Sequence, residues 1–153
     1  MTSVTPAIPL VDSHAHVYTT DMPLAPTAWH KPPADATIEQ YVSTLDRHGV
    51  KYAVLAAASL FDDYNEYSIE AVRKHPRLRT TVIVKPGIDP YVMRMMRDDG
   101  VVGVRLQWRN VKNLPDIASA EYVKFFRRVR DLDWHVHILS LIHISEPTRP
   151  ERI

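Results

Sequence analysis

The sequence predicts an α/β protein whose strands lie parallel in one sheet. Five short apolar segments alternate with stretches of helical periodicity, so that each predicted strand is followed by a helix before the next strand begins. This order places successive strands parallel through right-handed crossovers. At 153 residues, the pattern fits a complete flavodoxin-like sheet of five strands or an unfinished (β/α)₈ barrel, which usually needs ~250 residues. The pattern alone leaves both architectures open.

The first predicted strand covers residues 8–17 and precedes a proline-rich loop. Thr37 is expected to cap the first helix, because Gln40 stands at the capping-box spacing. Gly49 is placed to end this helix. Its apolar face follows the i, i+3, i+4, i+7 pattern, at Ile38, Tyr41, Val42 and Leu45.

The remaining elements continue the alternation. Asp89 and Pro90 predict the cap and first position of the third helix, and Ser119 predicts the cap of the fourth. The second helix is expected over residues 63–75, and the second to fifth strands over residues 52–58, 78–84, 101–106 and 134–138. The core face of the fourth helix is expected at Tyr122, Phe125, Phe126 and Val129.

The composition argues against several classes of function. The 19 basic and 18 acidic residues give a net charge of +1, which offers no electrostatic footprint for nucleic acid or an anionic membrane. No apolar run approaches the ~18 residues of a membrane helix. Cysteine is absent, so any metal must use histidine and carboxylate ligands. The first ten residues lack the pattern of a secretory signal, and a cytoplasmic location is expected.

The strongest chemical signal is the histidine pair His14 and His16 near the end of the first strand. Alternate side chains of a strand share a face, so both imidazoles, together with Asp12, are expected to point the same way. The pair could then present two nitrogen ligands to one cation, with Asp12 orienting one ring from behind. The alternative is that one histidine is a satisfied core residue and the other faces solvent. In barrels, active sites lie at this end of the strands, which favours the functional interpretation.

The motif VDSHAHVY at residues 11–18 resembles the D-x-H-x-H opening of the amidohydrolase superfamily, particularly its amidohydrolase 2 branch. That branch includes 2-pyrone-4,6-dicarboxylate lactonases and metal-dependent decarboxylases. The segment GVVGVRLQW at residues 100–108 is similar to the fourth strand of the lactonase-like members. The resemblance covers residues 9–138 and favours an incomplete (β/α)₈ TIM-type barrel, with about five strands and four helices of its N-terminal half.

The resemblance also implies roles for individual residues. His14 and His16 match the strand-one pair, which binds a divalent metal such as zinc in some members and polarises the substrate carbonyl without metal in the lactonases. Ser59 and Arg105 resemble positions that contact carboxylate groups of the substrate. A structural ion pair is the alternative for Arg105. His137, with its neighbour His135, forms a second i, i+2 pair whose assignment stays open, because the later histidine of this branch usually comes from strand six.

Three loop residues after the second strand, Asp62, Asp63 and Asn65, admit two interpretations: loop ligands or helix capping. The function implied by the resemblance is hydrolysis of a lactone, ester or amide bond in a small carboxylated substrate, with an Asp of strand eight activating water. Metal-dependent decarboxylation on the same scaffold is the alternative. No oligomeric state is predicted.

Residues 139–149 read LSLIHISEPTR, which resembles a translation of the transposon-end adapter used in sequencing libraries. We therefore expect residues 1–138 to be the N-terminal part of the barrel and residues 139–153 to be a non-native tail. A chain truncated in this way should expose unpaired sheet edges and be inactive.

Overall fold

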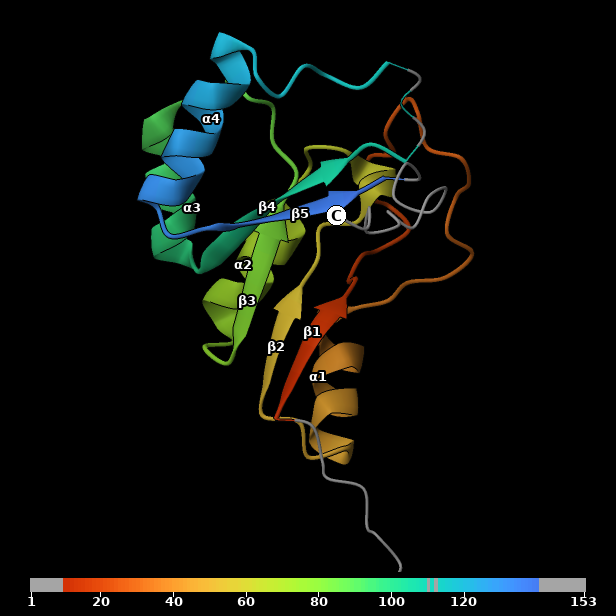
Figure 1. The fold of residues 1–153 in the computed structure, drawn as a ribbon. Coiled ribbons are helices and arrows are strands. Elements are labelled where there is room, and N and C mark those ends of the chain that lie inside the picture. Colours follow the sequence, from red (N-terminus) through yellow and green to blue (C-terminus); the bar gives the residue numbers. More distant parts are fainter. Residues whose placement is uncertain (1–9, 110, 112, 141–153) are drawn as a thin grey trace, which may run out of the picture.

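Five parallel strands form one curled sheet in the computed structural model of the chain (Figure 1), which describes residues 10–109, 111 and 113–140. The elements are, in chain order, β1 (Val11–Ala15), α1 (Ile38–Arg47), β2 (Tyr52–Leu55), the 3₁₀ helix η1 (Ser59–Phe61), α2 (Glu66–Lys74), β3 (Leu78–Val82), α3 (Pro90–Asp99), β4 (Val101–Gln107), α4 (Ala120–Asp131) and β5 (His135–Leu139).

The strand order distinguishes the two architectures that the sequence left open. A flavodoxin-like sheet has the order 2-1-3-4-5, whereas successive strands of a (β/α)₈ barrel are neighbours throughout. The observed order is β1-β2-β3-β4-β5, and all four pairings are parallel. The prediction of an incomplete TIM-type barrel is therefore confirmed.

The predicted helix starts are confirmed by their capping bonds. The Thr37 hydroxyl accepts from the Gln40 backbone N–H, and the Gln40 side chain accepts from the Thr37 N–H in return. Asp89 and Ser119 cap α3 and α4 through their side-chain oxygens. The connection after β2 differs from expectation, because residues 59–61 form η1; β2 therefore ends earlier and α2 begins later than predicted.

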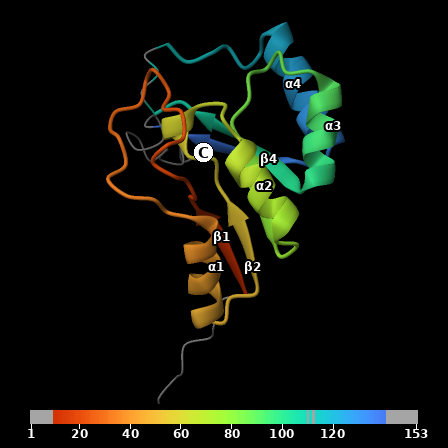
Figure 2. The same ribbon diagram turned by 180° about the vertical axis from the view of Figure 1, so that it is seen from behind.

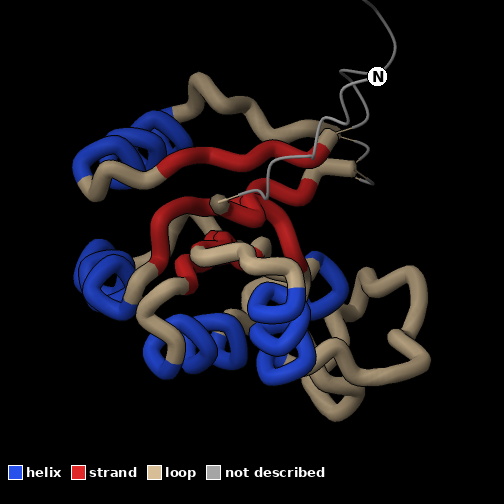
Figure 3. The backbone as a smooth tube through the Cα atoms, turned by 90° about the horizontal axis from the view of Figure 1, so that it is seen from below, coloured by secondary structure: helices blue, strands red, loops and turns tan. Residues whose placement is uncertain are grey.

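The helices cover one side of the curled sheet, as Figures 2 and 3 show. One core cluster joins α1 and α2 to β2 and the start of β3, and it includes Val17 just after β1; Leu45, Ala53 and Leu55 are almost fully buried in it. The other cluster joins α2, α3 and α4 to β3 and β4, around Met93 and Phe125. Side chains that alternate with these apolar strand residues lie on the opposite, inward side of the curl.

The outer side of β5 lacks such a cover among the described helices. Its two outward residues, Val136 and Ile138, are 38% and 43% exposed. Strands β1 and β5 are the two edges of the sheet. None of the helices within residues 10–109, 111 and 113–140 is both long and apolar enough to cross a bilayer.

Candidate active site

A bulge in β1 determines where its histidines point. Asp12 pairs with Ala53 and Ala15 pairs with Leu55, so three steps along β1 match two steps along β2. Paired residues of parallel strands lie on the same face, and Ala53 and Leu55 both belong to the helix-side core. The additional residue therefore leaves Asp12 on the helix side while His14, next to Ala15, lies on the inward side.

Three imidazoles meet on the inward side, although they come from opposite edges of the sheet. The ring centroid of His14 lies 5.0 Å from that of His16 and 5.2 Å from that of His137 on β5. Both contacts are edge-to-face, with interplanar angles of 79°. The curl of the sheet thus brings β1 and β5 close enough for their side chains to form one cluster. His137, whose assignment the sequence left open, belongs to it.

Arg105 lies beside this cluster and is only 4% exposed. Its Nη1 donates to the Ala57 carbonyl at 2.8 Å and lies 3.5 Å from Nε2 of His16. Its Nε is buried without a hydrogen-bond partner, and no ion pair joins Arg105 to a carboxylate of the described residues. The structural ion pair considered as an alternative role is thus absent within that part of the chain, and a buried cation has unused donor capacity.

The hydrogen bonds of His16 define its tautomer. Its Nδ1 lies 2.7 Å from the Ala56 carbonyl, an acceptor, so Nδ1 carries the proton and donates. The Nε2 lone pair then faces the Arg105 guanidinium. His16 keeps an exposed surface, yet partial burial among the strand ends lowers its pKa, and Arg105 and His14 add to the effect. The neutral, Nδ1-protonated imidazole is therefore the favoured form.

Burial also shifts the pKa values of the other two ionisable groups beside His16, which are His137 and Arg105. Burial lowers the pKa of His137, with further contributions from the positive charges of Arg105 and the neighbouring histidines. Burial also lowers the pKa of Arg105. A guanidinium remains protonated in proteins, so His16 and His137, whose neutral forms are favoured, lie beside one permanent positive charge.

The described hydrogen bonds of Asp12 reach no imidazole nitrogen, and its carboxylate lies on the helix side, not on the face of His14 where the sequence placed it. Its Oδ1 accepts from the backbone N–H of His14 at 3.1 Å, and its Oδ2 accepts from the Tyr41 hydroxyl of α1 at 2.9 Å. The bulge is the physical reason, because it interrupts the alternation on which the prediction depended. Asp12 acts on the strand backbone instead.

The residues after β2 have structural tasks. Asn65 is 3% exposed, and its side-chain amide exchanges hydrogen bonds with both backbone groups of Ile83, at 3.0 Å and 2.8 Å. Asn65 is the N-cap residue of α2 by position but makes no side-chain capping bond; its side chain instead joins this loop to Ile83. Asp63 forms an exposed ion pair with Lys85. Ser59 is the first residue of η1, and no described contact joins it to Arg105; its proposed contact with substrate stays a prediction.

The donor set of the described residues does not fit a metal ion by itself. No group of three or more metal-ligating side chains in that part of the chain is arranged to hold one. His14 and His16 are close enough to share a ligand, but Nε2 of His16 already faces the Arg105 cation. A divalent ion at this nitrogen would be repelled by the guanidinium at short range.

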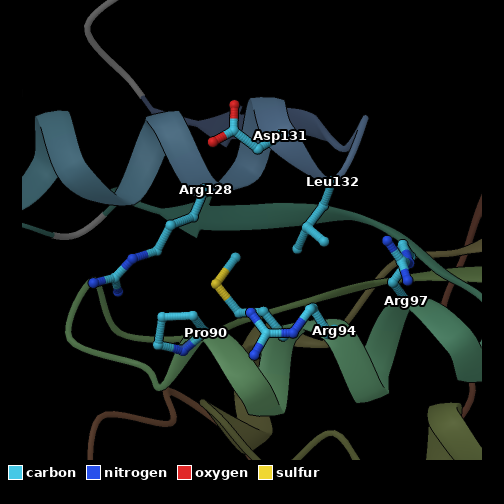
Figure 4. A pocket seen from close by; sticks show the side chains of 7 residues that line it. Pro90, Arg94, Arg97, Arg128, Asp131 and Leu132 are labelled. Atoms are coloured by element: carbon cyan, nitrogen blue, oxygen red, sulfur yellow. The ribbon is translucent and has the colours of Figure 1, made fainter.

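A separate cavity of about 230 Å³ lies between α3 and α4, on the helix side of the sheet (Figure 4). Arg94 and Arg97 of α3 and Arg128 of α4 stand around it, above the buried Met93. Arg97 is paired with Asp98, and Arg128 donates to the Ile88 carbonyl. This cavity includes none of the histidines.

Known proteins resemble this chain over most of its described length. The family model described as Amidohydrolase matches residues 11–153. A curated relative, 4-sulfomuconolactone hydrolase of Rhizobium radiobacter, is 26% identical over 131 residues, which are 83% of this chain and 43% of the relative.

Solved structures show the same similarity. A probable 2-pyrone-4,6-dicarboxylic acid hydrolase of Acinetobacter baumannii, crystallised with citric acid, has a TM-score of 0.81 and 31% identity, covering 84% of this chain and 48% of that protein. A Pseudomonas putida structure assigned to the same hydrolase class has a TM-score of 0.77 and 29% identity, covering 88% of this chain and 50% of that one. A manganese-bound 5-carboxyvanillate decarboxylase of Novosphingobium aromaticivorans, 16% identical at a TM-score of 0.60 over 85% of this chain and 49% of its own, shares the fold. The chain spans about half the length of these relatives.

Proposed function

This chain belongs to the amidohydrolase family, and from that premise we propose that its enzyme hydrolyses a lactone in a small substrate that carries two or more carboxylates. The hydrolase relatives named above support the reaction class. The observation that carries the proposal within this chain is Arg105, a buried cation with an unpartnered Nε beside three imidazoles.

Arg105 is suited to bind a substrate carboxylate. Burying a guanidinium without an anion is unfavourable, so a carboxylate that pairs with it gains a strong charge-assisted hydrogen bond. The bonds from Nη1 to Ala57 and toward His16 fix the orientation of the guanidinium before substrate arrives. This preorganisation lowers the ordering cost of binding.

The histidines are placed to act on the carbonyl next to that carboxylate. His16 in its Nδ1-protonated form offers Nε2 as a proton acceptor, and His14 presents an exposed ring 5.0 Å away. A ring N–H of His14 can polarise the carbonyl oxygen as negative charge develops on it. Attack by water then needs a general base, which the family resemblance assigns to a strand beyond β5. The Arg105 charge beside His16 favours the interpretation in which this pair works without a metal.

The proposal is tested with 2-pyrone-4,6-dicarboxylate as substrate and citrate as a non-reacting ligand. Arg105→Met should weaken citrate binding by about 3 kcal/mol, roughly 100-fold, because a buried charge pair loses one partner. Arg79→Met is the matched control. Arg79 also donates to backbone carbonyls, but it is exposed and lies near the start of β3, whereas Arg105 lies near the end of β4. Equal affinity of the two variants would refute the role of Arg105.

Turnover and metal content test the rest. In the full-length enzyme, which includes the strand that bears the general base, His14→Ala and His16→Ala should abolish hydrolysis with little change in the circular dichroism spectrum. A stoichiometric divalent ion whose removal stops turnover would disprove the metal-free mechanism. Release of carbon dioxide without ring opening would replace hydrolysis by decarboxylation.

A further inference from the structure

A hydrogen-bonded connection runs from the outer helix α1 to the histidine cluster inside the sheet. The Tyr41 hydroxyl donates to Oδ2 of Asp12 at 2.9 Å, and Oδ1 of the same carboxylate accepts from the His14 backbone N–H at 3.1 Å. We propose that Tyr41 is a positioning residue for His14, which it holds on the inward side of the sheet through Asp12. The proposal rests on the function proposed above only in treating His14 as part of the active site.

The bulge explains why His14 needs such support. Register pairs are formed by Asp12 and by Ala15 but by neither residue between them. The His14 N–H is satisfied by the Asp12 carboxylate instead of by the neighbouring strand. A one-residue change of register moves a strand side chain to the other face. Without the carboxylate, the bulge could therefore straighten and turn His14 toward the helices.

Tyr41 fixes the carboxylate in turn. Burial raises the pKa of Tyr41 far above its ordinary value, and the bond and charge of Asp12 raise it further, so that the hydroxyl remains a donor. Its helix is anchored independently, by the capping box at Thr37 and by the buried Ile38 and Leu45. Through the bond from Tyr41 to Asp12, the position of α1 therefore determines where the Asp12 carboxylate lies at the bulge.

The test uses Tyr41→Phe in the full chain, which removes one hydroxyl and little else. Tyr67→Phe is the matched control, because the Tyr67 hydroxyl also makes one hydrogen bond in this region, accepting from the Ile38 backbone N–H at 3.2 Å. Hydrogen exchange of the His14 amide and the NMR signals of its ring are measured in both. We expect exchange at His14 to rise about tenfold in Tyr41→Phe, equivalent to ~1.4 kcal/mol, and to be unchanged in Tyr67→Phe.

Variants of Asp12 establish whether Tyr41 acts through it. Asp12→Asn can keep both hydrogen bonds, with the amide oxygen accepting from His14 and the amide nitrogen donating to Tyr41, so the His14 signals should stay near their original positions. Asp12→Ala should displace them, and adding Tyr41→Phe to it should have no further effect on His14.

Several results would overturn the proposal. These are an unchanged His14 in a folded Tyr41→Phe, an equal response in Tyr67→Phe, or an additive effect in the double variant. If Tyr41→Phe does not fold, the two Asp12 variants provide the test. Equal displacement of the His14 signals in Asp12→Asn and Asp12→Ala is incompatible with the proposed connection. All these readouts are independent of turnover, so failure of the proposed hydrolysis in an enzyme that carries the general base would count against that reaction and not against Tyr41.

Discussion

Asn65→Ala should destabilise the chain more than any other polar-to-alanine change in the loops after β2 and β3. The Asn65 amide is 3% exposed and makes three hydrogen bonds, to the Asp63 carbonyl and to the N–H and carbonyl of Ile83. Ile83 is itself 8% exposed, so alanine would leave two of its backbone groups buried without partners. Each such group costs about 1–3 kcal/mol, and we expect a total loss of about 4 kcal/mol.

Urea unfolding monitored by circular dichroism measures this loss, provided that the slope with denaturant stays constant. Asn113→Ala is the control, since Asn113 is exposed and should change stability by less than about 0.5 kcal/mol. Asn65→Asp keeps the acceptor for the Ile83 N–H but places a carboxylate oxygen against a carbonyl, so its deficit should shrink as the pH falls and the acid becomes protonated. A loss below about 1 kcal/mol in Asn65→Ala would refute the reasoning, because water would then be satisfying Ile83.

Two further predictions concern the inward side of the sheet. The pKa values of His16 and His137 are lowered in the folded state, so below the ordinary histidine pKa of about 6.5 the unfolded chain binds more protons than the folded chain. The free energy of unfolding should therefore be highest above that pH and decrease as the pH falls toward 5, with a smaller decrease in His16→Gln. Equal urea midpoints at pH 7.5 and 5 would contradict this. Gly103→Ala should lower the free energy of unfolding by about 1–3 kcal/mol through overpacking, because the new Cβ would lie 2.7 Å from the His135 carbonyl oxygen and 2.8 Å from its ring. An unchanged melting temperature would contradict this, because β5 would then move aside freely.

Local signals in the sequence predicted the elements well. Thr37, Asp89 and Ser119 were identified as helix caps because a cap depends on residues only two or three positions away. Strand β5 likewise follows from its own composition, although it is shifted by one residue, to His135–Leu139. The predicted tail lies mostly outside the described residues.

Features that depend on distant partners were missed. The β1 bulge is a relation between two strands, and Asp12 alone does not reveal that its carboxylate meets Tyr41 on α1. Asn65 occupies the N-cap position of α2, as its place in the sequence suggested, yet its side chain bonds to Ile83, directly after β3. The proximity of His14 and His137 needed the curl of the whole sheet, which no local pattern encodes.

The strand order affects the sequence of steps in which the sheet can fold. Each strand pairs only with its neighbours along the chain, so nearly every step of sheet formation closes a loop of one βα unit, at a modest entropic cost. A nascent chain can therefore add β2 to β1 and then β3 to β2 while its later residues are still being synthesised. The contact between His14 on the first strand and His137 on the last is the exception. The imidazole cluster can therefore form only after β5 has joined the sheet.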